Sequence, residues 1–469
     1  MTAIMVAGTS SNAGKSVIVA ALCRIFSKMG YNVAPFKAQN MSLNSYVTDN
    51  GKEIAISQAI QAKAAGINPN EKMNPILLKP KGNYSSQLIV MGEVIKDVKI
   101  DEYYSMIPTL EKIVENAIRD LEREFDLIVI EGAGGIAEIN LFDRDLANIK
   151  TARIAKPNIM IVGDIERGGV FASLYGSYAL LPDDIKKMVR WFVINRLRGK
   201  AEILDSGIKK LEKLTGVKVV GVIPYIESVF SEDSLCMEEW RTENCKVGIV
   251  KLKRISNFTD FEPIREVCKF VSSKNNLEDL EVLIIPGSKN TIEDLKDLKE
   301  KGFEEKIRKF SKSKPIIGIC GGYQMLGKKL IDFGVEQSRA NLKGFSLLDI
   351  ETKFDNYKKI CKKVERVVIG NGAIIEKIKG KKVKGYEIHK GITKVMGKNV
   401  FEGEGCVSED GLVWGTYTHA LFWNENVVKA LSKYLGVKIP FTPYEERIDS
   451  FVSVFENHLD LDSIMRVLF

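Results

Sequence analysis

The sequence of 469 residues has little cysteine and less histidine. Its seven cysteines have no CxxC spacing, which predicts neither a disulfide framework nor a zinc site. No apolar run approaches the roughly 18 residues that a membrane span requires. No charged-then-apolar segment opens the chain, and internal repeats and low-complexity tracts are missing. These absences predict a cytoplasmic protein without a membrane partner.

Neither sign of charge dominates, since 69 basic residues face 61 acidic ones and the net charge is +8. A composition of 45% hydrophobic and 28% charged residues is typical of a globular protein. Much of the positive excess falls in the lysine-rich stretch 377–398, where few aromatic residues are interleaved. A solvated sheet edge explains this stretch better than a nucleic-acid surface. The mild positive charge favours an anionic substrate.

Short apolar runs such as Leu127–Ile130 and Ile159–Val162 alternate with helical stretches along most of the chain. This alternation predicts an α/β fold with mostly parallel sheets covered on both faces. The pattern is interrupted by the polar segment 231–244, after which a second α/β series begins. We therefore predict an N-terminal domain at 1–232, a linker at 233–246, a second domain at 247–440, and a helical tail at 441–469 packed on the second domain.

The segment GTSSNAGKS, directly after the first predicted strand, is typical of a nucleotide phosphate loop. The strict pattern has glycine at position 9, whereas this chain has Thr9 preceded by Gly8. The physical essentials remain, because Gly14 shapes the turn and Lys15 can hold the β- and γ-phosphates. Ser16 is the expected Mg²⁺ ligand, and the following helix directs its positive end at the phosphates. The pattern therefore predicts ATP and Mg²⁺ as cofactors.

Two further strand ends supply candidates for the same crevice. Glu131 ends a buried strand and is followed by glycines, as expected of an acid beside the Mg²⁺ of a phosphate-loop enzyme. Lys37, Gln39 and Asn40 follow the second strand. Lys37 is a candidate for the γ-phosphate, and Gln39 and Asn40 for the substrate carboxylate that receives it.

The second domain contains a strand, a sharp turn with a thiol, and a helix. Glycines on both sides of Cys320 permit a tight turn that exposes the thiol, as in a nucleophile elbow. The helix that follows lowers a thiol pKa, and its free amides can hold a developing oxyanion. We expect Gly321 to take part in this oxyanion site. Gly287 and Ser288, which end the preceding strand, are the candidates for its second amide.

A nucleophilic cysteine needs a base, and the chain has only three histidines. His419 follows the strand that ends at Tyr417 and is the expected base. His389 also ends a strand in this domain, where a structural role is as well founded as a functional one. A cysteine–histidine pair of this kind attacks an amide, which indicates release of ammonia from glutamine. Together with a phosphate loop, it predicts an ATP-dependent amide ligase.

The motifs resemble those of the cobyric acid synthases, the glutamine-dependent amidotransferases of cobalamin biosynthesis, over essentially the whole chain. The segments that carry the resemblance are GTSSNAGKS at 8–16, APFKAQNMSLNS at 34–45, MNPILLKP at 73–80, EGAG at 131–134, GDIERGGVF at 163–171, PGSKNT at 286–291, GICGGYQ at 318–324 and GYEIH at 385–389. The resemblance implies a dethiobiotin synthetase-like phosphate-loop domain. A class I glutamine amidotransferase-like domain would follow it.

The activity that the resemblance implies is amidation of the b, d, e and g carboxylates of adenosylcobyrinic acid a,c-diamide, with ATP and glutamine. By the same analogy Asn195 contacts the nucleotide base, and Asp164 lies near the substrate or metal. Gln324 and His389 fall in matching motifs and are assigned to the glutamine site. Class I enzymes usually have Glu two residues after the histidine, where this chain has Leu421. The prediction is therefore a Cys320–His419 dyad without a third member.

Two alternatives remain open at the level of sequence. The nearer one is a cobyrinic acid a,c-diamide synthase or another ATP-dependent carboxylate amidotransferase, such as one acting on lipid II. The other is a regulatory ATPase whose amidotransferase-like half only binds. The oligomeric state is open as well, and a homo-oligomer agrees with the sequence.

Overall fold

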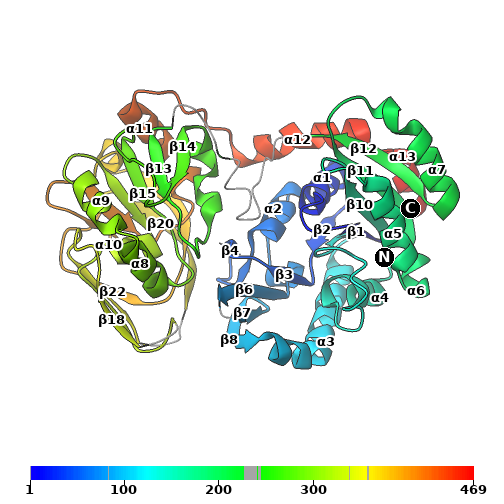
Figure 1. Cartoon of the computed structure of the whole chain (residues 1–469), viewed down its shortest axis with the longest axis horizontal. Helices are drawn as coiled ribbons and strands as arrows, with labels where there is room; N and C mark the ends of the chain where they lie inside the picture. The colour runs from blue at the N-terminus through cyan, green and yellow to red at the C-terminus, as the bar shows by residue number, and fades with distance from the viewer. Residues whose placement is uncertain (1, 83, 227–239, 241–244, 337–338, 356–358) are drawn as a thin grey trace. The chain divides into compact units, whose positions relative to one another are not determined.

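A computed structural model describes residues 2–469, with gaps at 83, 227–239, 241–244, 337–338 and 356–358 (Figure 1). The chain forms two compact units. The first comprises 1–42, 53–230 and 443–469, and the second comprises 43–52 and 231–442. The predicted linker at 233–246 lies mostly outside the described residues. The units otherwise differ from the predicted domains in the segment 43–52 and in the C-terminal tail.

The first unit is built on a six-stranded sheet of order β12-β11-β10-β1-β9-β2, in which every pairing is parallel, as predicted. Its strands are β1 (Thr2–Gly8), β2 (Val33–Phe36), β9 (Leu127–Glu131), β10 (Asn158–Asp164), β11 (Val189–Leu197) and β12 (Lys218–Pro224). Successive side chains point to opposite faces. Thus Met5 joins one core, whereas Ile4 and Val6 join the other. This explains why the strands are continuously apolar.

Helices cover both faces of this sheet. One face carries α3 (Ile100–Glu124), α4 (Thr151–Ala155), α5 (Val170–Leu180), α6 (Asp183–Lys186) and α7 (Asp205–Thr215). The other face carries α1 (Lys15–Lys28), α2 (Ile56–Ala64), α12 (Tyr444–His458) and α13 (Leu461–Leu468). A smaller sheet of order β3-β6-β7-β8 adds β3 (Gln39–Met41), β6 (Ile76–Gly82), β7 (Ser85–Val90) and β8 (Glu93–Lys99). The short strand β5 (Glu53–Ala55) leads into α2.

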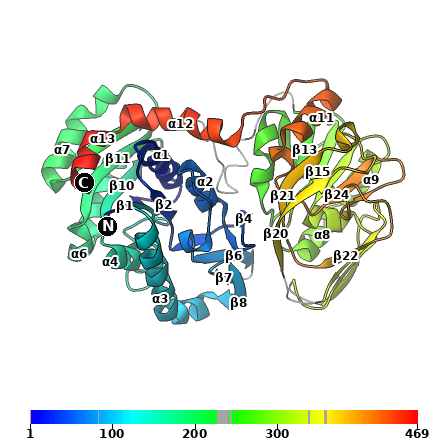
Figure 2. The same ribbon diagram turned by 180° about the vertical axis from the view of Figure 1, so that it is seen from behind.

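The C-terminal tail is helical, as predicted, but it packs on the first unit (Figure 2). The prediction that it packs on the second domain is wrong. The buried face of α12 presents Phe451 and Phe455 to the same core as α1. Asp449 pairs with Arg24 of α1 at 2.9 Å. The tail therefore completes the cover of the first sheet, which α1 and α2 alone leave partly open.

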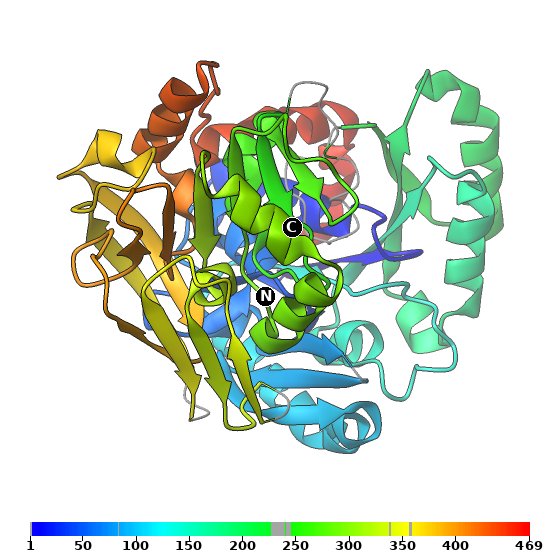
Figure 3. The ribbon, with the colours of Figure 1, turned by 60° about the vertical axis from the view of Figure 1, so that its left-hand side comes forward.

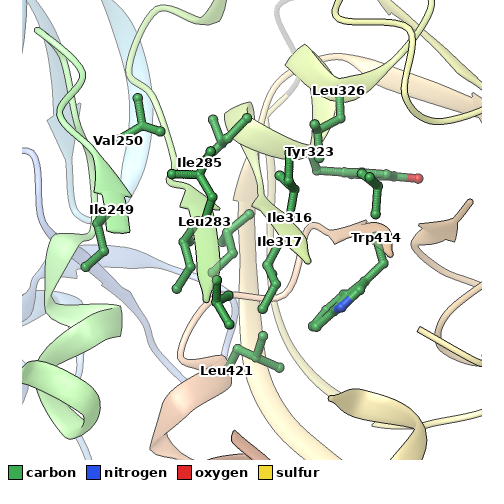
Figure 4. Close-up of a cluster of buried hydrophobic side chains, with 14 of the residues drawn as sticks. Ile249, Val250, Leu283, Ile285, Ile316, Ile317, Tyr323, Leu326, Trp414 and Leu421 are labelled. Atoms are coloured by element: carbon green, nitrogen blue, oxygen red, sulfur yellow. The ribbon is translucent and has the colours of Figure 1, made fainter. Parts of the chain in front are cut away.

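The second unit contains a six-stranded sheet of order β14-β13-β15-β16-β24-β23. It is parallel except for the last strand, which pairs antiparallel. Its strands are β13 (Val247–Val250), β14 (Cys268–Val271), β15 (Val282–Ile285), β16 (Ile316–Ile319), β23 (Cys406–Val407) and β24 (Val413–Thr416). In Figure 4, Tyr323 and Leu326 pack on one side of these strands and Leu421 on the other.

The helical elements of the second unit are η5 (Phe258–Val267), α8 (Thr291–Glu300), α9 (Phe303–Phe310), α10 (Gly321–Leu326), η6 (Ile375–Ile378), η7 (Leu421–Trp423) and α11 (Glu425–Leu435). A small sheet of order β18-β17-β19-β22 comprises β17 (Lys329–Asp332), β18 (Ala340–Lys343), β19 (Ile350–Phe354) and β22 (Ile392–Val395) (Figure 3). Strands β20 (Ile360–Val367) and β21 (Lys382–His389) form an antiparallel pair. β22 lies in the lysine-rich stretch and is an edge strand, in agreement with the sheet-edge interpretation.

Candidate active sites

The predicted residues of the first unit gather at the carboxyl edge of its parallel sheet. They lie at or just beyond the carboxyl ends of β1, β2, β9, β10 and β11, and these strands end at Gly8, Phe36, Glu131, Asp164 and Leu197. In register, Asp164 is level with Asn195 and Val6 is level with Glu131. This edge of an open α/β sheet is where ligands bind.

Close contacts with the side chains of Lys15 and Asn195 account for the glycines of the phosphate loop. Gly14 has φ of 96° and precedes α1, and a Cβ there would lie 2.0 Å from the side-chain nitrogen of Asn195. That nitrogen donates to the carbonyl of Ala13 at 2.9 Å. A Cβ at Gly8 would lie 2.9 Å from Nζ of Lys15. Side chains at either position would displace the lysine or the asparagine.

Lys15 is 6% exposed, and its ammonium donates to the carbonyls of Ser10 and Gly134, each at 2.9 Å. These bonds hold the charge over the loop, where a phosphate can displace them. Thr9, at the position where the strict pattern has glycine, donates its backbone N–H to Val162 at 2.9 Å. The loop is thus anchored to β10 without glycine at that position.

Glu131 is fully buried at the centre of a polar network. One carboxylate oxygen accepts from Ser16 Oγ at 2.8 Å and from Lys37 Nζ at 2.6 Å. The other accepts from the side-chain amides of Gln58 and Gln61. Burial raises the pKa of Glu131, but the charge of Lys37 outweighs it and holds the pKa below its usual value. Glu131 is therefore an anion that already has a cationic partner.

The oxygens of Ser16 and Glu131 fit a hard cation such as Mg²⁺. Within the described ranges, no group of three or more His, Cys, Asp or Glu side chains could hold a metal ion. Mg²⁺ often keeps several waters and binds through one or two carboxylates and the substrate phosphates. Ser16 and Glu131 would therefore suffice as the protein ligands of an ion of that kind.

Gln39 and Asn40 point in different directions, as neighbours on a strand do. Gln39 is half-buried and accepts a hydrogen bond from the hydroxyl of Tyr103. Asn40 is buried and donates to Ser57 Oγ at 2.9 Å and to Gln58 Oε1 at 3.0 Å. Asn40 thus contacts the Glu131 network through Gln58, whereas Gln39 faces a cleft.

That cleft has a volume of about 680 Å³ and begins at the phosphate loop. Its lining is mostly apolar, with Met41, Leu78, Tyr84, Val98, Tyr103 and Leu146 among the residues. Thr9, Ser10, Ser11 and Gly134 form the end next to the loop. The cleft offers a broad apolar surface beside the position expected for the γ-phosphate.

Asn195 and Asp164 are engaged by the protein itself. The carboxylate of Asp164 pairs with Arg196 at 2.9 Å and accepts the backbone N–H of Glu166 at 2.8 Å. A second cleft, of about 610 Å³, is lined partly by residues that follow Arg196 closely in sequence. It is lined by Leu197, Gly199, Lys200, Ala201, Glu202, Val222, Pro224 and His458. Asn195, which binds the phosphate loop, lies two residues before Leu197, the first residue in the chain that lines this cleft.

In the second unit, Cys320 stands on the predicted sharp turn between β16 and α10. Its φ of 52° and ψ of −108° are strained for a residue with a side chain. A Cβ at Gly322 would lie 1.9 Å from the carbonyl oxygen of Ile285, so only glycine fits there. Cys320 is 6% exposed, and its sulfur lies 3.6 Å from the carbonyl oxygen of Ile388. The sharp turn is therefore confirmed, whereas the expected exposure of the thiol is wrong, because Cys320 is buried.

His419 is buried, and its Nδ1 lies 2.7 Å from a carboxylate oxygen of Asp260. The other oxygen of Asp260 accepts the backbone N–H of Ala420 at 2.9 Å. Tyr386 stacks on the imidazole with ring centroids 5.3 Å apart. Burial lowers the pKa of His419, but the charges of Asp260 and Cys320 outweigh it and raise the pKa to about 10. The positive charge of an imidazolium beside the sulfur would stabilise the negative charge of a thiolate.

The prediction that His419 has no third partner is therefore wrong. The class I pattern predicts the acid two residues after His419, whereas Asp260 precedes it by 159 residues. Asp260 lies in η5, after β13, and belongs to neither a strand end nor a glycine motif. Its one sequence signal is an acid within the apolar segment Phe258–Phe261. Within the described part of the chain, His419 Nε2 has no hydrogen-bond partner, so the reactive nitrogen is left for the thiol and the glutamine amide.

The predicted oxyanion residues converge on this pair. A Cβ at Gly287 would lie 3.2 Å from His419 Cε1, and one at Gly321 would lie 2.9 Å from the backbone nitrogen of Ser288. The backbone that follows β15 thus approaches both the imidazole and the first turn of α10. This is a suitable arrangement for two amides that face one oxyanion.

Gln324 and His389 are held by protein partners. Gln324 donates to the carbonyl of Lys390 and to the hydroxyl of Tyr417, each at 3.0 Å, and accepts from Thr291 at 2.9 Å. His389 stacks on Tyr417 with ring centroids 3.6 Å apart. Both side chains therefore shape the wall near Cys320.

Comparison with known proteins agrees with this division. Residues 4–234 match a family model described as a CobQ/CobB/MinD/ParA nucleotide binding domain. Residues 246–427 match one described as a CobB/CobQ-like glutamine amidotransferase domain. A "Probable cobyric acid synthase" of Archaeoglobus fulgidus is 58% identical over 463 residues, which cover 98% of this chain and 99% of the relative. The chain belongs to the cobyric acid synthase family.

A second member of this family, from Methanococcoides burtonii, is 50% identical and covers 98% of this chain and 96% of its own length. Membership makes the chain a glutamine amidotransferase-type ligase with a nucleotide-binding domain. Among the helices of the described residues, none has the length and apolar character to cross a bilayer.

Similarity to solved structures is much weaker. The signal recognition particle receptor FtsY from Elizabethkingia anophelis in complex with GDP is 16% identical, with a TM-score of 0.30, and the match covers 47% of this chain and 56% of that one. PurLQS from Thermotoga maritima is 18% identical with a TM-score of 0.29, over 41% of this chain and 99% of that one.

Proposed function

We propose that this enzyme amidates the b, d, e and g carboxylates of adenosylcobyrinic acid a,c-diamide, with ATP as the activating substrate and glutamine as the nitrogen donor. The first unit activates a carboxylate, and the second unit releases ammonia. Each half of the reaction relies on residues described above.

Glutamine cleavage begins with attack of the Cys320 thiolate on the carboxamide carbon. Negative charge develops on the amide oxygen, where the backbone N–H groups of Gly321 and Ser288 can donate to it. The imidazolium of His419 gives its proton to the departing nitrogen, so ammonia leaves and a glutamyl thioester forms. Water then attacks the thioester and loses a proton to His419, the thiolate departs, and glutamate is released.

Carboxylate activation follows the chemistry of phosphoryl transfer. A carboxylate is a poor electrophile at neutral pH, so its oxygen first attacks the γ-phosphate of ATP, forming an acyl phosphate and releasing ADP. Lys15 and Lys37 hold the phosphate charge, and Ser16 and Glu131 would hold Mg²⁺, which neutralises charge on the phosphates. Ammonia then attacks the acyl carbon, and phosphate leaves.

The apolar cleft beside the phosphate loop supports a large, mostly hydrophobic acceptor. Its aromatic and aliphatic lining suits a macrocycle, while Gln39 stands where a peripheral carboxylate would approach the γ-phosphate. For the nucleoside we propose the second cleft, after Asn195, because that residue binds the phosphate loop directly.

The observation that carries the proposal is the contact between Asp260 and His419 behind a strained Cys320. A binding module has no need of a buried carboxylate on a histidine next to a thiol at a left-handed turn. This arrangement favours an active glutaminase over a regulatory ATPase with an inert second half.

The proposal is tested by ATP consumption with a panel of acceptors: cobyrinic acid, its a,c-diamide, cobyric acid and lipid II, each with glutamine or ammonium. We expect ADP release with the a,c-diamide and a cobyric acid product. Preference for unamidated cobyrinic acid would instead identify an a,c-diamide synthase. Absence of glutaminase activity under all conditions would favour the regulatory alternative.

A further inference from the structure

Residues 43–52, which we call the arm, lie in the first half of the chain but belong to the second unit. The chain leaves β3 of the first unit, enters the arm with its short strand β4 (Ser45–Val47), and returns at β5. No resemblance or periodicity in the sequence predicted this excursion. Its contacts indicate what the arm does.

The arm binds the turn that begins η5. The carbonyl oxygen of the Asn44 side chain accepts the backbone N–H of Phe258 at 3.1 Å. The backbone N–H of Ser45 donates to Asn257 Oδ1 at 2.9 Å. Asn257 has a left-handed φ of 52°, and its side-chain nitrogen lies 3.4 Å from His419 Nδ1. The arm therefore holds the left-handed turn at Asn257, three residues before Asp260.

A second set of arm contacts reaches His419 from its stacked face. The ring of Tyr46 lies 6.1 Å, centroid to centroid, from that of Tyr386, which itself stacks on His419. Val47 packs in a small cluster with Tyr386 and Ile388. The carbonyl of Ile388 is the one that faces the Cys320 thiol.

We infer that Asn44, Ser45 and Tyr46 are positioning residues for glutamine cleavage, although they lie within the nucleotide-binding half of the sequence. They act through Asn257, Asp260 and Tyr386, which fix the imidazole relative to the sulfur. The inference rests on the proposed function only in taking Cys320 and His419 as the glutaminase.

The continuity of the chain adds a consequence. Gln39 lines the acceptor cleft, and Asn40 binds the network around Glu131. Only Met41 and Ser42 separate these residues from the arm. A shift of β3 caused by binding of the acceptor and Mg·ATP would therefore be carried along the backbone to the residues that orient His419. Glutamine cleavage should accelerate when the first unit is loaded.

The test uses the full-length enzyme and the variant Asn44→Ala, which removes the acceptor from Phe258 N–H. We expect the kcat of glutamine hydrolysis to fall about 10- to 100-fold, with an unchanged KM for glutamine, because the imidazole is misplaced while glutamine contacts remain. Stimulation by Mg·ATP and the corrinoid acceptor should be lost. Synthesis from ammonium should continue at the wild-type rate.

Two further variants separate positioning from general stability. Asn44→Asp keeps an oxygen acceptor at the same place and should restore most of the lost rate. Asp49→Ala, at the other end of the arm, removes an exposed ion pair with Lys363 and should leave every rate unchanged.

Wild-type kcat and wild-type stimulation in Asn44→Ala would overturn the inference. A parallel fall in glutamine- and ammonium-driven synthesis, with a lowered melting temperature, would also overturn it, because the arm would then be merely structural. A wild-type enzyme without any glutaminase activity would refute the proposed function itself.

Discussion

Replacement of Asp260 by Asn alters the charge on His419 with little change in volume. Asp260 is 2% exposed, and its two oxygens accept from His419 Nδ1 and from the backbone N–H of Ala420. Asparagine offers one oxygen in place of two and can turn its NH₂ group toward the ring. The substitution thus removes the negative charge and weakens control over the tautomer of His419.

The expected loss can be bounded. In a serine protease, removing this carboxylate lowers kcat about 10⁴-fold, largely because the tautomer is wrong. A thiol ionises more readily than a hydroxyl, so it depends less on its base. We therefore expect a fall of about 10²- to 10³-fold in kcat for glutamine hydrolysis, which corresponds to about 2.7–4 kcal/mol.

The pH dependence gives an independent readout. The pKa of His419 is raised from 6.5 to about 10 in the folded protein, so the pair with Asp260 stabilises the fold fully below about pH 6.5. That contribution is lost as pH rises through about 10. In the Asp260→Asn variant the pKa of His419 should fall, because the negative charge beside the imidazole is removed. Unfolding free energy should then depend less on pH in this window than it does in the wild-type enzyme.

The assay is glutamate release between pH 6 and pH 10, with denaturant unfolding at the same pH values. Asp332→Asn is the matched control, because Asp332 is also buried but accepts only backbone N–H groups in the described structure. The control should lose stability without losing glutaminase activity. If Asp260→Asn retains the wild-type rate and pH profile, Asp260 has no part in catalysis and the dyad stands.

Three other predictions concern the first unit. Lys15→Ala should lower amidation from either nitrogen source by several hundredfold, a loss on the order of 3–4 kcal/mol, while part of the glutamine hydrolysis survives. Glu131→Gln should weaken synthesis and shift its Mg²⁺ titration; an unchanged titration would remove Glu131 from the metal site. Because one site must accept four differently placed carboxylates, mono-, di- and triamidated corrinoids should appear free in an early time course. Chromatography that detects only the fully amidated product from the first turnover would refute this release of intermediates.

Much of the fold followed from local pattern. Continuous apolar runs predicted both parallel sheets, and the residues at their carboxyl ends were found together because parallel strands bring those ends to one edge. The elbow at Cys320 was predictable for a similar reason, since a thiol between glycines after a buried strand can take a left-handed turn. Lys15 and Glu131 were predictable for the same reason, because each lies in a recognisable motif at or after the end of a buried strand.

What could not be predicted depends on long-range packing. Asp260 reaches His419 because η5 packs against η7, where Phe261 contacts Phe422, and no spacing in the sequence encodes that packing. The apolar face of α12 could have packed on either unit. Its fit against α1, which determines that it packs on the first unit, cannot be read from the sequence. The arm at 43–52 is short and polar, so its membership in the second unit follows from contacts such as that between Asn44 and Phe258.

The division of labour between the two units is tested most directly by Cys320→Ala, assayed for corrinoid amidation with glutamine and, separately, with a high concentration of ammonium. We predict that glutamine no longer supports amidation, whereas ammonium supports it at the wild-type rate, since Cys320 takes part only in ammonia release. His419→Ala should behave in the same direction. Loss of ammonium-driven amidation in a Cys320→Ala enzyme with its fold intact would contradict the proposed separation of the two reactions.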